Sequence, residues 1–241
     1  MKKMIIGTLF LFVIIASGCS NSPKTSSGYA KMEWMDFIKL NGHSYQVINT
    51  GTLSDPSLVG KEIGIVKFMV SDNVTKPNYK IKDGDAAFLE KGTKIYEVKE
   101  NPDLVVVKDQ QAIGGYSVYY RDRGSYNYHF KNLNQNEVKK IQIYEDHGDT
   151  KLEHRLLSTL TDSSQIKNFF GVLNQGKEDS NFRYDHSHPD QKVFTIVFYT
   201  KKAVAYRDNI LYNGKEYGWT PWSQEVLPVT IEKFLNNKQF N

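Results

Sequence analysis

The chain of 241 residues contains a single cysteine, Cys19. With one thiol, no intramolecular disulfide can form, so no covalent link stabilises the fold. A chain of this length can bury enough apolar surface to fold without such links, whereas domains below about 40 residues usually need disulfides or a metal. We therefore expect a folded part that rests on a hydrophobic core, and a role for Cys19 other than disulfide formation.

The residues before Cys19 have the composition of a secretory signal peptide. Lys2 and Lys3 precede a charge-free apolar run from Met4 to Gly18. This run is shorter than the ~20 apolar residues that a membrane-spanning helix needs. It has the length and the small-residue ending of a signal peptide's apolar region. A short transmembrane anchor is the alternative interpretation.

Residues Ala16–Cys19, with the sequence Ala-Ser-Gly-Cys, resemble the lipobox of bacterial lipoproteins. Ala16 departs from the usual pattern, in which Leu, Val or Ile stands at this position. The resemblance implies that residues 1–18 are removed and that Cys19 carries a diacylglycerol on its sulfur. Two acyl chains, at ~0.8 kcal/mol per buried methylene, anchor a protein stably. The resemblance thus predicts a lipid-anchored protein on the extracellular face of the cell membrane.

A polar stretch follows the cysteine. Ser20–Ser27, with the sequence SNSPKTSS, is rich in turn-forming residues, and we predict a lipidated tether over residues 19–31. Without residues 1–18 the chain has 29 basic and 27 acidic residues, a formal net charge of +2. So small a charge argues against a nucleic-acid-binding protein. It permits a mild attraction to anionic cell-wall polymers.

Residues 32–122 carry the signals of short strands. Apolar and polar residues alternate in parts of Glu62–Val70, and the flanking stretches Asn49–Ser57 and Ser71–Asn78 are rich in turn formers. Several such segments without a convincing helix between them predict a β-rich first domain, with a small barrel or a sandwich-like fold.

Residues 123–241 predict a second domain of the α+β class. Thr161–Gly176 has one apolar stripe and an acidic N-cap, and Gly176 is suited to end the helix. Val193–Thr200 is a continuous apolar run, typical of a strand covered on both faces. Asn213-Gly214 predicts a two-residue hairpin, and Pro228 the start of a last helix. The prediction for the whole chain is an α+β, β-rich fold, ending in an antiparallel sheet with two helices.

Asp55–Lys99, with the sequence DPSLVGKEIGIVKFMVSDNVTKPNYKIKDGDAAFLEKGTKIYEVK, is similar to surface lipoproteins of Gram-positive, Bacillus-like bacteria. This resemblance supports the predicted location and implies no particular activity.

One cluster has the residue types of a metal site. Asp185, His186, His188 and Asp190 could supply carboxylate and imidazole ligands to a divalent cation. The cluster falls in a predicted loop, where the same residues are ordinary solvated side chains. A metal-dependent envelope enzyme that uses His186 and His188 is therefore the alternative function, and no cofactor is predicted.

The segment YGWTPW supplies the candidate binding residues Tyr217, Trp219 and Trp222. Loops between rigid elements often carry binding residues, and two indoles beside a proline could contact a glycan or a peptide. In the alternative interpretation, both indoles close off the core over the last helix.

The sequence contains neither the G-x-S-x-G elbow of α/β-hydrolases nor a glycine-rich phosphate-binding motif. We therefore predict a non-enzymatic protein that binds an envelope component or modulates a neighbouring membrane protein. The predicted partners are the membrane, reached through the diacylglycerol, and a cell-wall polymer or a membrane protein. Nucleic acid is not a predicted partner.

Overall fold

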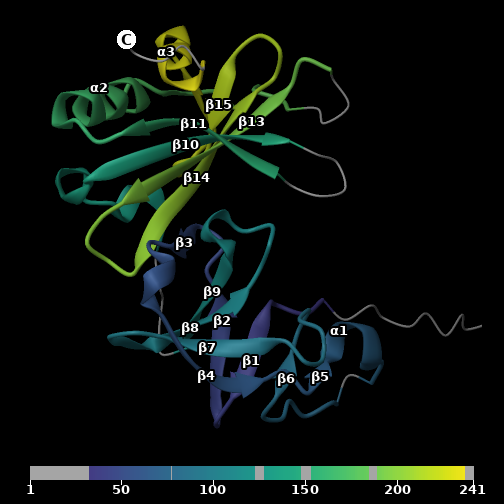
Figure 1. Ribbon diagram of the computed structural model, residues 1–241. Helices are drawn as coiled ribbons and strands as arrows, with labels where there is room; N and C mark the ends of the chain where they lie inside the picture. The colour runs from purple at the N-terminus through teal and green to yellow at the C-terminus, as the bar shows by residue number, and fades with distance from the viewer. Residues whose placement is uncertain (1–32, 77, 123–127, 148–152, 185–188, 237–241) are drawn as a thin grey trace, which may run out of the picture. The chain divides into compact units, whose positions relative to one another are not determined.

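The computed structural model describes residues 33–76, 78–122, 128–147, 153–184 and 189–236. Within these residues the chain is β-rich and belongs to the α+β class, as predicted (Figure 1). Residues 32–241 form one compact unit. The domain division near residue 122 stays a prediction.

The described residues of the first part of the chain form a curled eight-stranded sheet, sheet A. Neighbouring strands are antiparallel except for the last pair, which is parallel. In spatial order the strands are β4 (Val59–Ile65), β7 (Lys94–Val98), β8 (Asn101–Lys108), β9 (Tyr116–Arg121), β2 (His43–Val47), β1 (Phe37–Leu40), β6 (Asp85–Ala86) and β5 (Phe68–Met69). One four-residue helix, α1 (Val70–Asn73), and two short 3-10 helices, η1 (Pro56–Leu58) and η2 (Ile113–Gly115), accompany them.

The described residues of the second part form an antiparallel sheet, sheet B. Its order is β11 (Glu153–Leu160), β10 (Lys140–His147), β13 (Lys192–Tyr199), β14 (Val204–Tyr212), β15 (Tyr217–Trp219), β16 (Glu225–Leu227) and β12 (Lys177–Glu178). The accompanying helices are η3 (Phe130–Asn132), η4 (Gln135–Glu137), α2 (Ser163–Leu173), η5 (Val229–Ile231) and α3 (Glu232–Leu235).

Helix α2 forms for the reasons that its sequence indicates. The Asp162 carboxylate accepts hydrogen bonds from the backbone N–H groups of Ser164 and Gln165, at 2.9 and 3.0 Å, which satisfies two otherwise unpaired donors. The apolar stripe is buried, and the ring of Phe169 meets that of Phe234 of α3 edge-on at 5.0 Å. The helix ends at Leu173 with Asn174 as its C-cap, so the prediction that Gly176 ends it is wrong, because Gly176 lies two residues beyond the cap.

The predicted strand over Glu62–Val70 is divided, because β4 ends at Ile65, β5 spans Phe68–Met69 and Val70 begins α1. The other strand predictions hold with two corrections. Strand β13 is buried along most of its length, as its continuous apolar run predicts. The Asn213-Gly214 hairpin joins β14 to β15, but Asn213 donates its N–H to the Glu216 carbonyl, so Gly214 and Lys215 form the tip. The turn is displaced by one residue because Gly214 takes the positive φ, 91°, that this position requires.

The second correction concerns Gly51–Leu53, which lies in a predicted turn and instead forms a strand, β3. Strand β3 pairs with β14 of sheet B, although the residues on either side of it belong to sheet A. A Cβ on Gly51 would lie 2.7 Å from the Val204 side chain, so only glycine permits this close approach. Strand β3 therefore ties the two sheets together and positions the site described next.

Candidate functional site

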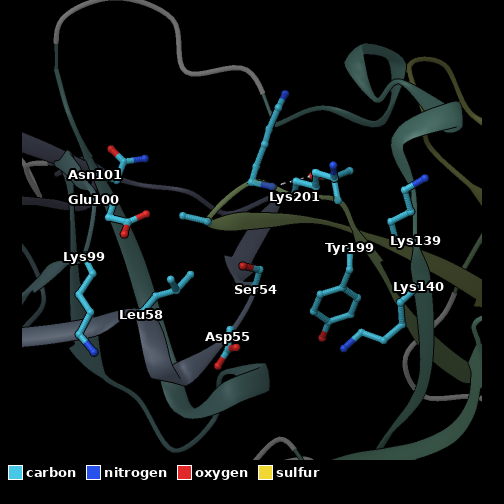
Figure 2. Close-up of a pocket in the computed structure, with 13 residues that line it drawn as sticks. Ser54, Asp55, Leu58, Lys99, Glu100, Asn101, Lys139, Lys140, Tyr199 and Lys201 are labelled. Atoms are coloured by element: carbon cyan, nitrogen blue, oxygen red, sulfur yellow. Dashed lines mark hydrogen bonds between the residues drawn. The ribbon is translucent and has the colours of Figure 1, made fainter.

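A cavity of 530 Å³, which we call the lysine pocket, lies where β3 brings segments of both sheets together. Figure 2 shows Lys99 and Asn101 on the wall opposite Lys139 and Lys140, with Ser54, Asp55 and Tyr199 between them. The lining residues are Ser54, Asp55, Leu58, Lys99, Glu100, Asn101, Lys139, Lys140, Tyr199, Thr200, Lys201, Lys202 and Ala203.

One wall is built from η1 and the turn between β7 and β8. The Asp55 carboxylate accepts the backbone N–H of Ser57 at 2.8 Å and caps η1. Lys99 donates its backbone N–H to the Leu58 carbonyl and its ammonium group to the Ser57 carbonyl, both at 2.8 Å. Glu100 adopts φ 62°, which turns the chain sharply into β8. These contacts hold η1 and the turn against each other.

The opposite wall is built from the start of β10 and the turn after β13. Lys140 pairs with Tyr199 across the two strands, and Lys139 donates its backbone N–H to the Tyr199 carbonyl at 2.9 Å. The backbone N–H of Ser54 donates to the Ala203 carbonyl at 2.9 Å. Because Ser54 directly follows β3, this bond continues the β3–β14 pairing to the pocket rim and joins the two walls.

The pocket is electropositive. Five lysines line it, Lys99, Lys139, Lys140, Lys201 and Lys202, against the two carboxylates of Asp55 and Glu100, which gives a local net charge of +3. In the part of the chain that the structure describes, none of the five lysines forms an ion pair with a carboxylate. Their ammonium groups can therefore pair with an anion that enters the pocket.

Two contacts shape the charges inside the pocket. The hydrogen bond from the Ser57 backbone lowers the pKa of Asp55, and the positive charges of Lys140 and Lys99 lower it further. Asp55 is therefore ionised at neutral pH and contributes one negative charge at the edge of η1. The Lys140 ammonium group lies 3.8 Å from the centre of the Tyr199 ring, and this cation–π contact directs Lys140 along the pocket wall.

The charge of the pocket suits the binding of an anion. Among the described residues that line the pocket there is no histidine or cysteine to act as a base or a nucleophile at neutral pH. Several ammonium groups spread around one cavity match an extended anion that carries more than one negative group.

The candidate residues of YGWTPW fall into two different environments. Tyr217 and Trp219 lie on β15 and are buried in the core, with Trp219 2% exposed. Trp222 lies in the following turn and is 68% exposed. The Lys131 ammonium group lies 3.1 Å from the centre of the Trp222 ring, and His129 meets that ring edge-on. Trp222 is thus the member of this set that a partner can reach.

The candidate metal ligands Asp185, His186 and His188 lie outside the described residues, as does Cys19. Asp190 is described and is exposed. Among the residues that the structure places, no group of three or more His, Cys, Asp or Glu side chains could hold a metal ion.

Sequence reasoning missed the lysine pocket, although one signal for it exists. Lys139-Lys140 and Lys201-Lys202 are two lysine pairs, one at the start of the apolar–polar alternation that becomes β10 and one just after the apolar run that becomes β13. If these two strands are antiparallel neighbours, as β10 and β13 are, both pairs lie at the same end of the sheet. The place of Lys99 in the pocket could not be predicted from the sequence, because the wall that carries Lys99 is brought to the other lysines by the pairing of β3 with β14.

No protein family, curated protein or solved structure matches this chain. Among the described residues, no helix has both the length and the apolar composition required to cross a bilayer.

Proposed function

We propose that this protein is a lipid-anchored surface protein, tethered through Cys19, that binds an anionic component of the bacterial envelope in the lysine pocket. It acts as a binding protein and not as an enzyme. The observation that carries the proposal is the gathering of five lysines around one cavity, none of which forms an ion pair with a carboxylate of the described residues. Of the two predicted roles, envelope binding and modulation of a membrane protein, this cavity favours the first.

The proposed location rests on the sequence. The apolar run Met4–Gly18 and the lipobox-like Ala16–Cys19 support export and lipidation. The polar composition of residues 19–31 supports a tether between the lipid and the folded part. A pocket on a protein anchored in this way meets the polymers and headgroups next to the membrane, many of which are anionic.

Replacement of Cys19 by alanine tests the anchor. We expect Cys19→Ala to abolish metabolic labelling of the protein with fatty acid and to release it from the membrane fraction, because alanine has no sulfur to carry the diacylglycerol. Cys19→Ser is the matched control for side-chain size and should also remain unlabelled. Labelling that persists in both variants would contradict the lipoprotein assignment.

A triple substitution tests the pocket. We expect Lys140→Gln/Lys201→Gln/Lys202→Gln to weaken binding of the full-length, detergent-solubilised protein to inorganic polyphosphate by about ten-fold. Three exposed charge contacts at about 0.5 kcal/mol each give this factor. Added salt should weaken wild-type binding further, because it screens exposed charges. Calorimetric titration provides the measurement.

The control is a second triple variant, Lys80→Gln/Lys91→Gln/Lys215→Gln, which removes the same charge from exposed lysines outside the pocket. It should bind polyphosphate within about two-fold of the wild type, since charges beyond about 10 Å are screened at 0.1 M salt. Equal losses in the two triple variants would show that net charge alone attracts the polyanion, and would refute the pocket.

A further inference from the structure

A second hollow, which we call the amide groove, lies between η4 and α2 and has a volume of 630 Å³. Three amide side chains line it, those of Gln135, Asn136 and Asn174. Gln135 and Asn174 exchange two side-chain hydrogen bonds of 3.3 Å across the groove. These bonds are long, and each amide keeps a further donor and acceptor for a ligand.

The rest of the groove combines an apolar floor with a polar rim. Val138, Ile166 and Phe170 form the floor and are buried. The hydroxyl groups of Thr161 and Ser163 stand on the rim. No carboxylate lines the groove among the described residues. An apolar floor with amide and hydroxyl groups around it matches a neutral polyhydroxylated unit, which presents C–H groups on one side and hydroxyls at its edges.

The two hollows share a residue. Lys139 lines both the lysine pocket and the amide groove, because it lies between Val138, which lines the groove, and Lys140, which lines the pocket. A second cation, Lys167 of α2, also lines the groove. Positive charge therefore continues from one hollow into the other, beside a lining that is otherwise neutral.

We propose that the lysine pocket and the amide groove form one extended site for a chain of phosphodiester-linked polyols or sugars. The inference rests on the proposed function and names its ligand class. The phosphates lie against the lysines, and a hydroxylated unit lies in the groove. A polymer fits better than a single lipid headgroup, because two hollows joined by Lys139 offer places for successive phosphate and polyol units.

Gly171 of α2 offers a precise way to close the groove. It lines the groove, and a Cβ built on it meets no heavy atom within 4 Å. A larger side chain at this exposed helical position therefore enters the groove rather than the core. Glycine is also a poor residue for a helix interior, so its replacement should not unfold α2.

The test compares Gly171→Tyr with its matched control, Gly171→Ala, in the full-length protein. The probes are glycerol-phosphate oligomers and inorganic polyphosphate, of which only the first carries hydroxylated units. We expect Gly171→Tyr to weaken oligomer binding by about ten-fold, the loss that follows when one or two hydrogen bonds are blocked. Polyphosphate binding should stay within two-fold of the wild type. Gly171→Ala should bind both probes normally, and thermal melting of both variants checks the fold.

A second variant, Asn136→Ala, removes an exposed amide without filling the groove, and should weaken only oligomer binding. If Gly171→Tyr binds the oligomer as tightly as Gly171→Ala does, the extended site is refuted while the lysine pocket stands. If the pocket triple variant binds polyphosphate normally, the proposed function itself fails. If phosphatidylglycerol vesicles bind with the same dependence on Gly171 and oligomers do not, the ligand is a lipid and the polymer assignment is overturned.

Discussion

Trp219→Ala should lower the free energy of unfolding by about 3–5 kcal/mol, because truncation of a large buried aromatic ring leaves a cavity in the core. Trp219 is 2% exposed, and its ring lies 4.7 Å from that of Phe130 in an edge-on contact. Its indole N–H donates to the Glu225 carboxylate at 3.2 Å. The variant therefore loses packing, an aromatic contact and a hydrogen bond at once. Urea unfolding, followed by circular dichroism, measures the loss.

Trp222→Ala is the matched control for the same change of residue type. Trp222 is 68% exposed and its principal contact is with Lys131, so we expect a loss of at most about 1 kcal/mol, the value of an exposed cation–π contact. Trp219→Phe keeps a ring in the core but removes the bond to Glu225, and should fall between the two. Equal unfolding midpoints for Trp219→Ala and Trp222→Ala would contradict the burial that separates the two residues.

The two tryptophans illustrate what sequence patterns can determine. Tyr217 and Trp219 are two residues apart, the spacing that places both on one face of a strand. Trp222 lies in the turn that follows, where no periodicity fixes the direction of a side chain. The sequence therefore identified YGWTPW as a candidate binding segment. Only the fold shows that Trp219 is buried and that Trp222 is exposed.

Local chemistry accounts for the parts of the fold that were predicted correctly. The helix over Ser163–Leu173 is specified by its Asp162 cap and its apolar stripe, both of which are contained in a dozen consecutive residues. The strand over Lys192–Tyr199 is specified by its uninterrupted apolar run. In both cases the stabilising groups are close in sequence, so a short window contains the whole signal.

Strand β3 shows why the lysine pocket could not be predicted. Gly51–Leu53 is too short for an alternation pattern to appear and has the composition of a turn. It is a strand because it pairs with β14 and because the Thr52 hydroxyl donates to the Ile113 carbonyl at 2.6 Å. These partners are distant in sequence. A site whose walls depend on such pairing cannot be inferred from local composition.

The stability of the protein should fall as the pH rises above about 6.5, the ordinary pKa of histidine, because of a half-buried contact at His154. Its Nδ1 lies 2.5 Å from the Asp146 carboxylate and its Nε2 lies 2.9 Å from the Gln111 carbonyl. Both partners are acceptors, so only the protonated ring, which donates from both nitrogens, satisfies them. The contact joins Gln111, between β8 and β9, to β10 and β11 of sheet B.

The sign of the pH dependence follows from the direction of the pKa shift. The hydrogen bond to Asp146 raises the pKa of His154 against the opposing effects of burial and of the nearby Arg207, and the Gln111 carbonyl adds to the rise. A pKa that is higher in the folded than in the unfolded state gives a stabilisation that is complete below the unfolded value. That stabilisation is lost as the pH rises through the folded value. The pH range in which this stabilisation is lost therefore starts near 6.5 and extends to higher pH.

Asp208 titrates in a neighbouring pH range, and its contribution to stability must be distinguished from that of His154. Burial raises the pKa of Asp208 to about 6, so the stabilisation from its protonated form is lost as the pH rises from about 4 to 6, below the His154 window. His154→Gln leaves Asp208 in place. The difference in unfolding free energy between wild type and His154→Gln, measured by urea unfolding from about pH 5.5 to 9, therefore isolates the histidine.

We expect that difference to be largest near pH 6 and to shrink steadily toward pH 9. Asp146→Ala should cost about 3 kcal/mol near pH 6, because it removes the carboxylate that holds the protonated ring of His154 and one of the two acceptors near the Thr195 hydroxyl. In this variant His154 no longer gains from protonation, so further substitution of His154 should leave the remaining pH dependence above 6.5 unchanged. A wild-type advantage that stays constant across the range would show that His154 packs as a neutral ring and that Asp146 does not hold its proton.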